Sequence, residues 1–281
     1  MSPIQNNSEI LFIYDGKMTN PNGDMDNENK PRMDYDTDTN LVSDVRLKRY
    51  IRDYFETVKE KEIFVTKNAK DAKDRGNQIQ HKYLNMIDVK LFGAVYADKG
   101  GNDHKTGPVQ FNWGYSLNPV EIMESSTITS SFSDQKGIGK DFRVKYSLIA
   151  FNGSINALVA KDTEMNDNDL AEFDKAMVNA IPYARTRSKI GQTPRLYLRV
   201  ELENKTILKD LREYISIDYN FDNKYLLRSI DDYKLNIDGL ISYLKDKSIS
   251  KIFYWKDDNF KISGWDNFKD QFKDKLELII N

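Results

Sequence analysis

The sequence predicts an α+β fold built on the element order strand, helix, strand, strand, helix, strand. Three observations support this class. Short apolar runs of strand length recur along the chain, two longer segments repeat their apolar residues with the period of a helix, and one late segment alternates as a strand does. We expect these elements to form one split βαβ unit, with further segments inserted into it or appended to it.

The first strand is the apolar run Glu9–Tyr14 (EILFIY), bounded by the turn residues Asp15 and Gly16. A long loop, 15–40, follows it. The loop contains the motif NPNG and six acids, at positions 24, 26, 28, 34, 36 and 38. A loop of this length usually has a function when it lacks structure of its own.

The clearest helix covers about 41–59, with Ser43 available as its N-cap. Its apolar residues fall within about 100° of arc and predict one buried face. They are Leu47, Ile51, Tyr54, Phe55 and Val58. Four cations lie away from that face, Arg46, Arg49 and Arg52 opposite it and Lys48 on its shoulder. Together with the unpaired N–H groups at the helix start, these cations could hold phosphates; the alternative is an ordinary solvated helix face.

The middle of the chain is less regular. Residues 60–80 are charged and weakly periodic, which predicts a peripheral insertion. Strand character returns in Asp88–Ala97 and in Val109–Leu117, with KGGNDHKTGP between them as a turn or flexible loop. Ser125–Ser133 (SSTITSSFS) is rich in hydroxyl residues and precedes two glycines and a basic strand. This pattern predicts a protruding β-hairpin that buries little, so we expect its tip to contact a partner rather than to be an idle loop.

The last elements complete the predicted unit. Lys145–Ala160 is a long strand with Gly153 as an expected bulge, and a helix covers about Asp167–Ile181. Arg195–Leu202 alternates as a strand. The resulting order is that of ferredoxin-like and RNA-recognition folds. Balanced Lys and Asp with scattered aromatic residues follow in 204–281, where we expect a mixed helical part.

Positive charge is concentrated in the segment 181–200 of a chain whose formal net charge is only -2. The segment contains no acid and five basic residues, Arg185, Arg187, Lys189, Arg195 and Arg199. Tyr183 and Tyr197 are interleaved with them. This composition suits a phosphate backbone with stackable bases, so nucleic acid is the first partner to test. The alternative is a set of solvated charges flanking a core strand.

Composition limits the classes of protein to consider. A chain of 281 residues with 39% hydrophobic residues can bury a full core. The absence of cysteine excludes disulfides, thiolate metal sites and thiol nucleophiles. The N-terminus lacks the pattern of a secretion signal, and no apolar run approaches membrane-spanning length. We therefore expect a soluble, cytoplasmic protein with no membrane contact.

Enzyme motifs are incomplete. The KGIGK sequence at 136–140 departs from a Walker A phosphate loop at Asp134 and Asp141. His81 and His104 have no partners at the spacing of a metal site or a catalytic triad. We therefore expect no catalysis, no cofactor and no metal.

The acidic loop leaves one alternative open. The acids that begin at Asp24 and Asp34 resemble calcium loops but lack the required Gly and the closing Glu. Two or three convergent carboxylates would suffice for a metal-dependent RNase, so the loop Asp24–Asp38 is the candidate site for that activity. The other interpretation is a solvated acidic loop.

Several sequence blocks in one order resemble a known family. They are NPNGD at 20–24, NKPRMD at 29–34, LVSDVRLKRYIRDY at 41–54, DVKLFGAV at 88–95 and GPVQFNWGYSLNPVE at 107–121. This series resembles the backbone subunit of the CRISPR Cascade complex, CRISPR-associated protein seven, and is most similar to its type I-B branch. The motifs ITSSF and SLIAFNGSINA extend the resemblance to the region of Arg185, so that it covers about 8–203.

The resemblance implies a right-hand shape with an RNA-recognition palm, a fingers insertion and a thumb hairpin. The palm would comprise 8–60, 86–120 and 142–203, the fingers 61–85 with part of 98–108, and the thumb 121–141. Copies would stack along CRISPR RNA with other Cascade subunits and present the guide to a target DNA strand in antiviral defence. Subunits of this branch are non-catalytic.

Residue roles follow from the resemblance by position. Arg46, Lys48 and Arg49 would grip phosphate, and Ser116 and Asn118 in the SLNP motif would line the RNA path. Charge and the predicted hairpin add further candidates. The full set of predicted RNA-binding residues is Arg46, Lys48, Arg49, Arg52, Ser116, Asn118, Phe132, Lys136, Lys140, Arg185, Arg187 and Lys189. The rival hypotheses are the metal-dependent RNase and a purely structural scaffold.

Overall fold

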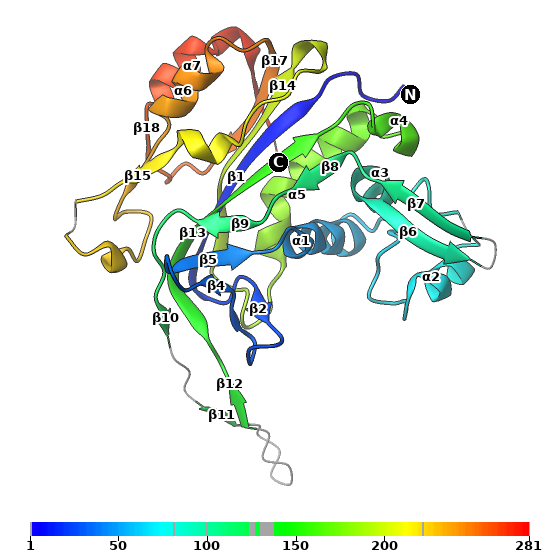
Figure 1. The fold of residues 1–281 in the computed structure, drawn as a ribbon, viewed down its shortest axis with the longest axis horizontal. Coiled ribbons are helices and arrows are strands. Elements are labelled where there is room, and N and C mark those ends of the chain that lie inside the picture. The colour runs from blue at the N-terminus through cyan, green and yellow to red at the C-terminus, as the bar shows by residue number, and fades with distance from the viewer. Residues whose placement is uncertain are drawn as a thin grey trace.

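A computed structural model of the chain describes residues 2–80, 82–98, 101–123, 127–129, 138–220 and 222–280. Within them, a ten-stranded mixed sheet follows the path β19-β17-β14-β1-β13-β9-β5-β4, and β8 and β10 also pair with β13 (Figure 1). The central strands are β1 (Ser8–Thr19), β13 (Arg143–Ile155) and β14 (Gln192–Leu202). Outside β14 lie β17 (Ile249–Lys256) and β19 (Leu276–Leu278). Beside β13 lie β8 (Val109–Phe111), β9 (Gly114–Ser116), β10 (Ile122–Met123), β5 (Thr39–Val42) and β4 (Met33–Asp34).

Two long helices lie on one face of this sheet, α1 (Asp44–Thr57) and α5 (Asp167–Tyr183). Both begin at sequence-encoded caps. The Ser43 side chain accepts a hydrogen bond from the backbone N–H of Arg46, and Asn166 with Asp169 forms a capping box. In chain order, β1, α1, β8 with β9, β13, α5 and β14 reproduce the predicted order of strands and helices. The predicted α+β class is therefore confirmed.

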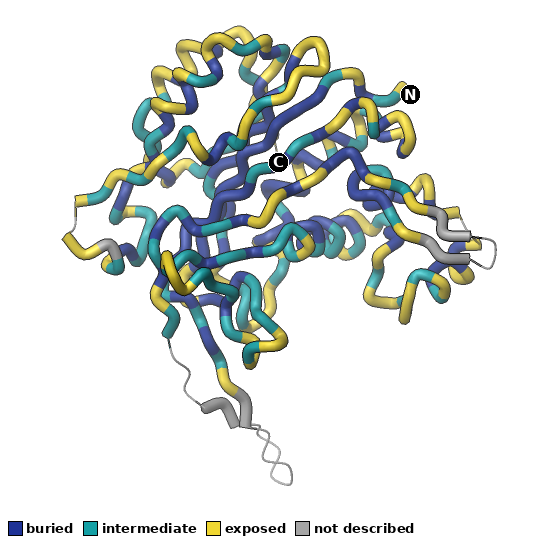
Figure 2. Tube along the Cα trace, in the orientation of Figure 1, coloured by how far each residue is buried: buried dark blue, intermediate teal, exposed yellow. Residues whose placement is uncertain are grey.

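Alternate residues of β1 enter two different cores. Ile10, Phe12 and Tyr14 pack with the buried faces of α1 and α5. Leu11 and Ile13 point to the opposite face and pack with the C-terminal part of the chain. Figure 2 shows the resulting band of buried strands through the middle of the molecule. Both faces of the central strands are thus covered by protein.

Smaller elements surround the sheet. The insertion after α1 contains α2 (Ala72–Gln78), α3 (Ile87–Phe92) and the hairpin β6 (Gly93–Asp98) with β7 (Gly101–Thr106), and it has a small core of its own. The hairpin β11 (Thr127–Thr129) with β12 (Ile138–Lys140) lies at the bottom of the view, below β10 (Figure 1). A short helix, α4 (Ala160–Thr163), precedes α5. None of the helices in the described part of the chain combines the length and apolar character needed to cross a lipid bilayer.

The prediction that 15–40 is a loop without structure of its own is wrong. β1 continues to Thr19 because Asp15 is paired inside the sheet with Arg195 at 2.9 Å and accepts a hydrogen bond from Tyr146 at 3.0 Å. Two small hairpins follow. They are β2 (Gly23–Asp24) with β3 (Lys30–Pro31), and β4 with β5.

Three further expectations need correction. Asp88–Ala97 begins as the helix α3, which Gly93 ends with a φ of 77° that favours glycine. Val109–Leu117 is split into β8 and β9. Gly153 is no bulge, since its pairing with β1 is continuous; a Cβ there would lie 2.5 Å from the Phe111 ring, so glycine is required by close packing.

The helical character predicted for 204–281 is also wrong in part. The segment contains α6 (Asp238–Leu244) and α7 (Trp265–Gln271), but also a small sheet of β15 (Ser216–Asp218), β16 (Lys234–Asn236) and β18 (Ile262–Ser263). Single 3₁₀ turns cover 203–205, 211–214, 224–226 and 273–275. β17 joins the main sheet by pairing with β14. Its residues alternate between the two faces of the sheet, as those of a strand do.

Candidate nucleic-acid interface

The start of α1 is built by the NPNG loop. The Asn22 side-chain oxygen accepts hydrogen bonds from the Ser43 N–H and from the Ser43 hydroxyl, both at 2.9 Å. Ser43 in turn caps the helix. The loop is therefore fixed at the helix end that carries unpaired N–H groups and partial positive charge, which is the end that favours anions.

Two cations from distant parts of the sequence meet beside this helix start. Lys189 donates from Nζ to the carbonyl oxygens of Asn20 and Pro21, the latter at 3.0 Å. The guanidinium of Arg46 lies over the Tyr50 ring, 4.1 Å from its centroid. Burial, and secondarily the charge of Arg46, lowers the pKa of Lys189 to about 7. We name Arg46 and Lys189 the cation pair.

The cation pair differs from the other three cations of α1 in its partners. Within the described residues, neither Arg46 nor Lys189 forms an ion pair with a carboxylate. In the same part of the chain, the buried Arg46 Nε also has no hydrogen-bond acceptor. Two cations held together without a counter-ion are electrostatically unfavourable, and an anion would stabilise them.

The other three cations of α1 have structural partners, which corrects their predicted position on a solvated face. Lys48 is buried and donates to Asp44 and Gln110, each at 3.1 Å. Arg49 pairs with Asp53 at 2.5 Å, and Arg52 pairs with Asp88 at 3.2 Å. For Arg49 and Arg52 the reason is that the inserted segment packs against this side of the helix. Its contribution includes the carboxylate of Asp88, which is fully buried, and the backbone around Val65.

Ser116 and Asn118 do not line an open path, which is a second correction. Both are buried. The Ser116 hydroxyl accepts from the Asn40 N–H at 2.9 Å and donates to the Asn118 carbonyl at 2.7 Å. The Asn118 side chain donates to the Tyr146 carbonyl and accepts from the Leu148 N–H. Their polar atoms hold the turn after β9 against β13, so they act on the fold.

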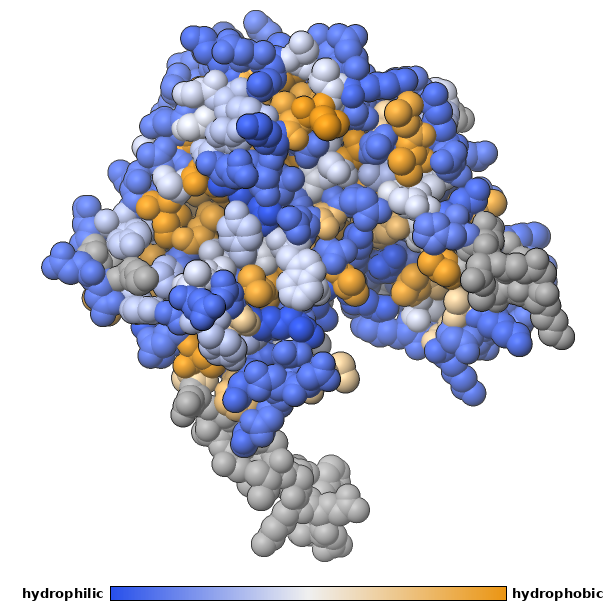
Figure 3. All heavy atoms as spheres, viewed as in Figure 1, coloured by the Kyte–Doolittle hydropathy of each residue, from blue (hydrophilic) through white to orange (hydrophobic). Residues whose placement is uncertain are grey.

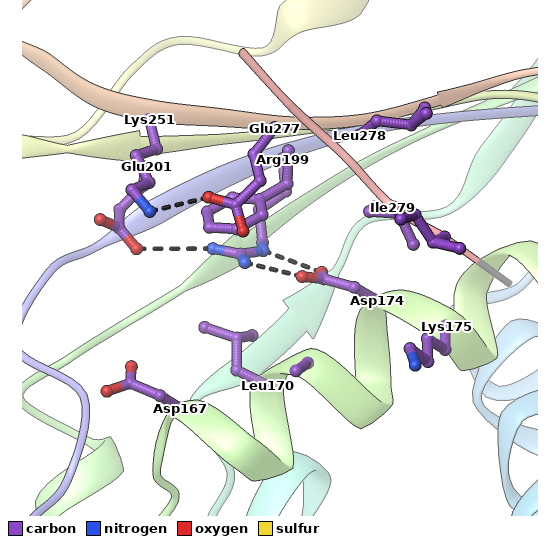
Figure 4. Close-up of a pocket in the computed structure, with 13 residues that line it drawn as sticks. Asp167, Leu170, Asp174, Lys175, Arg199, Glu201, Lys251, Glu277, Leu278 and Ile279 are labelled. Atoms are coloured by element: carbon purple, nitrogen blue, oxygen red, sulfur yellow. Dashed lines mark hydrogen bonds and ion pairs between the residues drawn. The ribbon is translucent and has the colours of Figure 1, made fainter. Parts of the chain in front are cut away.

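The basic segment separates into structural and exposed parts. Arg199 is 2% exposed and binds Asp174 through two hydrogen bonds of 2.7 and 2.8 Å. Figure 4 shows this pair, with Glu201 beside it, in a pocket of about 540 Å³ between α5 and the strands β14, β17 and β19. Arg195 pairs with Asp15 and Asp257. These two arginines are therefore neutralised by carboxylates inside the fold, so they are not the solvated charges of the alternative interpretation.

Two arginines and one tyrosine of the segment are accessible. Arg185 is exposed and donates to the Pro182 carbonyl at 3.2 Å. Arg187 is exposed and pairs with Asp141 at 3.1 Å. Tyr183 is 58% exposed and packs on Tyr54, whereas the Tyr197 ring is buried and cannot stack on a base. Figure 3 shows the largely hydrophilic face that the molecule presents in the same view as Figure 1.

The predicted thumb is described only at its base. β11 and β12 form the expected antiparallel hairpin, with Thr127 opposite Lys140. Lys140 is exposed and pairs with Glu28 of the β2–β3 turn at 2.7 Å. Phe132 and Lys136 lie outside the described residues.

The acids of the loop 24–38 are distributed over two hairpins. Asp24 pairs with Arg32 at 3.1 Å, and Asp34 accepts hydrogen bonds from the Asp36 N–H and the Thr37 hydroxyl. Asp38 accepts from the Tyr225 hydroxyl. Across the described residues, no group of three His, Cys, Asp or Glu side chains is arranged to hold a metal ion.

Sequence reasoning missed the neutral residues that build the interface. Tyr50 lies under Arg46 and donates to the Gln192 side chain at 3.1 Å, and Asn20 supplies a carbonyl to Lys189. The NPNG motif was the only local signal for this contact. The pairing of β1 with β14 brings Gly16 opposite Gln192 and so carries the loop with Lys189 to the motif.

The second face of the sheet is closed to RNA. RNA-recognition domains stack bases on aromatic residues of an open sheet face. Here the corresponding face presents Leu11, Leu148 and Leu198, which are buried beneath the C-terminal part. A nucleic acid therefore has to use other surface features. The cation pair at the start of α1 is a candidate, because neither of its members has a carboxylate partner among the described residues.

Comparisons with known proteins agree with this description. A family model described as "CRISPR-associated protein Cas7" matches residues 6–238. A curated relative from Haloferax volcanii, "CRISPR-associated protein Cas7", is 31% identical over 287 residues, covering 85% of this chain and 83% of that protein. Two solved structures share the fold. A chain of a "CRISPR RNA-guided surveillance complex" has a TM-score of 0.54 at 16% identity, with 90% of each chain covered. A chain of a "CRISPR RNA-guided surveillance complex, pre-nicking" has a TM-score of 0.53 at 10% identity, covering 92% of this chain and 94% of that one. The chain therefore belongs to the Cas7 family of CRISPR-associated proteins.

Proposed function

We propose that this chain is a non-catalytic backbone subunit of a type I-B surveillance complex, which binds CRISPR RNA through phosphates. The observation that carries the proposal is the cation pair, Arg46 and Lys189, which lies at the start of α1 without a carboxylate partner in the described residues. A phosphodiester supplies the missing negative charge, and the helix N-terminus favours the same ligand.

The wider assembly follows as part of this proposal. Further copies stack along the RNA, and the guide bases remain available for pairing with a target DNA strand, while the protein reads backbone and shape. The segments 8–60, 86–120 and 142–203 form the proposed palm, 61–85 with part of 98–108 the fingers, and 121–141 the thumb. Membership of the Cas7 family and the fold shared with chains of RNA-guided complexes support this arrangement.

The test compares matched charge reversals. The double variant Arg46→Glu and Lys189→Glu reverses the charge of the cation pair. The control double variant, Lys245→Glu and Lys273→Glu, makes the same change in net charge at two exposed lysines of the C-terminal part. Binding of a fluorescent single-stranded RNA is measured as a function of salt. Loss of two phosphate contacts makes the log-log salt slope shallower by about 1.4 in the first variant. Equal losses in both variants would contradict the assignment.

The same protein preparation distinguishes the proposed function from the two rival hypotheses, the RNase and the structural scaffold. Incubation of the RNA with Mg²⁺ or Mn²⁺ should leave it intact, whereas cleavage that Asp24→Asn or Asp34→Asn abolishes would favour the RNase. The expressed chain should carry RNA and form oligomers whose size falls after nuclease treatment. An RNA-free chain that neither cleaves nor binds RNA would support the structural scaffold.

A further inference from the structure

The surroundings of Lys189 have a consequence for regulation that rests on the function proposed above. Its Nζ is held by two neutral carbonyl oxygens, of Asn20 and Pro21. The ammonium group is thus largely removed from water and has no carboxylate to offset the loss of hydration. In this setting the charged form of a lysine is disfavoured until an anion arrives.

Each element packed around Lys189 adds charge of the same sign or none. α1 contributes Arg46 and the neutral Tyr50, whose hydroxyl donates to Gln192. The loop of Lys189 itself contributes Arg187, whose guanidinium forms an ion pair with the carboxylate of Asp141 at 3.1 Å. The loop that follows the end of β1 presents the carbonyls of Asn20 and Pro21.

The carboxylates of the neighbouring segments are already engaged. Asp141 also binds Arg143 at 2.9 Å, and Asp44 of α1 binds Lys48 at 3.1 Å. Burial, with the repulsion from Arg46, holds the pKa of Lys189 near 7 in the free chain. A bound phosphate reverses the sign of the local field and returns the lysine to its charged form.

We propose that binding of an RNA phosphate at the Arg46 and Lys189 pair takes up a proton, so that the affinity of the subunit for RNA weakens as the pH rises above neutrality. The phosphodiester itself stays ionised throughout this range. Protonation of Lys189 therefore becomes part of the binding equilibrium, and the subunit binds RNA more tightly on the acidic side of neutrality.

The size of the effect follows from linkage. Protonation that is half complete at neutrality in the free chain and complete in the complex weakens affinity about tenfold between pH 6 and pH 8. The same linkage gives an uptake of about half a proton per subunit at pH 7 and about one at pH 8. Calorimetry in two buffers of different ionisation enthalpy measures this number independently of affinity.

The experiment uses the full chain and a fluorescent single-stranded RNA at constant ionic strength. A background with His81→Gln and His104→Gln removes both histidines of the chain, so that no imidazole contributes to the pH dependence. In this background, Lys189→Arg keeps the positive charge at every pH, because a guanidinium does not deprotonate in this range. It should bind RNA with an affinity that no longer changes from pH 6 to pH 8. Lys17→Arg, an exposed lysine of β1, should keep the tenfold change.

The possible outcomes are distinct. RNA binding that is independent of pH before any change at Lys189 would overturn the inference and leave the proposed function standing. A pH dependence that persists in Lys189→Arg would place the titrating group elsewhere and also overturn it. Absence of RNA binding at every pH would instead overturn the proposed function. Circular dichroism at each pH confirms that the variants compared are folded, and Lys189→Gln, which should bind weakly at both pH values, provides a second variant if the arginine is not accommodated.

Discussion

Replacement of Arg52 by Ala tests the division of α1 into structural and RNA-binding cations. Arg52 binds the carboxylate of Asp88, which is fully buried and also accepts the backbone N–H groups of Phe64 at 2.8 Å and Val65 at 3.0 Å. Loss of the guanidinium leaves a buried charge without its cation. Breaking such a pair costs about 3 to 5 kcal/mol. Because Asp88 keeps two backbone donors, we expect a loss of about 3 kcal/mol in the free energy of unfolding.

Urea unfolding followed by circular dichroism measures this loss, and a double-mutant cycle assigns it. In an Asp88→Asn background the buried charge is absent, so Arg52→Ala should cost at least about 1 kcal/mol less than in the unchanged chain. RNA affinity of the folded Arg52→Ala variant should stay within about twofold, because the arginine has no free charge to offer. Unchanged stability with a large loss of RNA affinity would refute the assignment and restore Arg52 as an RNA contact.

Three other perturbations have defined outcomes. Burial raises the pKa of Glu9 to about 8, above the unfolded value of 4.5, so the unfolded chain binds fewer protons and stability falls as the pH rises between these values. Linkage limits this decline in the free energy of unfolding to about 1.4 kcal/mol per pH unit. Glu9→Gln should remove it, and thermal melts at several pH values measure the difference. Gly153→Ala should cost about 1 to 3 kcal/mol in urea unfolding, since its Cβ would meet the Phe111 ring; an unchanged midpoint would show that β8 moves freely. Glu28→Gln should leave the unfolding midpoint unchanged and strengthen RNA binding in a fluorescence titration, because it releases Lys140; weaker binding would show that Glu28 is needed to position that lysine.

Local sequence patterns predicted the helices and strands whose apolar residues recur with a regular period. The apolar stripe of α1 recurs in the structure with Leu47, Ile51, Tyr54 and Phe55 buried. Asp167–Ile181 and Arg195–Leu202 were also identified, each within a few residues of its observed ends. Helical period and strand alternation are properties of the segment itself, so a single sequence is enough to reveal them.

The candidate site required information that no local segment contains. A helical wheel places Arg52 opposite the apolar stripe, but only the fold brings the carboxylate of Asp88 to it. The same limit applies to Ser116, to which the family resemblance gave a place on the RNA path and whose partners, Asn40 and Asn118, are both buried. Composition marked Lys189 and Arg199 as equals, although one lacks a carboxylate partner among the described residues and the other has Asp174. Charge in a sequence locates cations, whereas the pairing of each cation depends on tertiary structure.

The C-terminal part, which covers the second face of the sheet, also affects how the chain folds during synthesis. Leu11 and Leu148 are synthesised before the residues that bury them, among them Ile252 and Phe268. A ribosome-bound chain therefore exposes an apolar sheet until its final segments emerge. Chains interrupted before β17 should aggregate or recruit chaperones, although they contain every residue of the proposed RNA-binding surface. Translation must accordingly pass β17 before the apolar face of the sheet is covered.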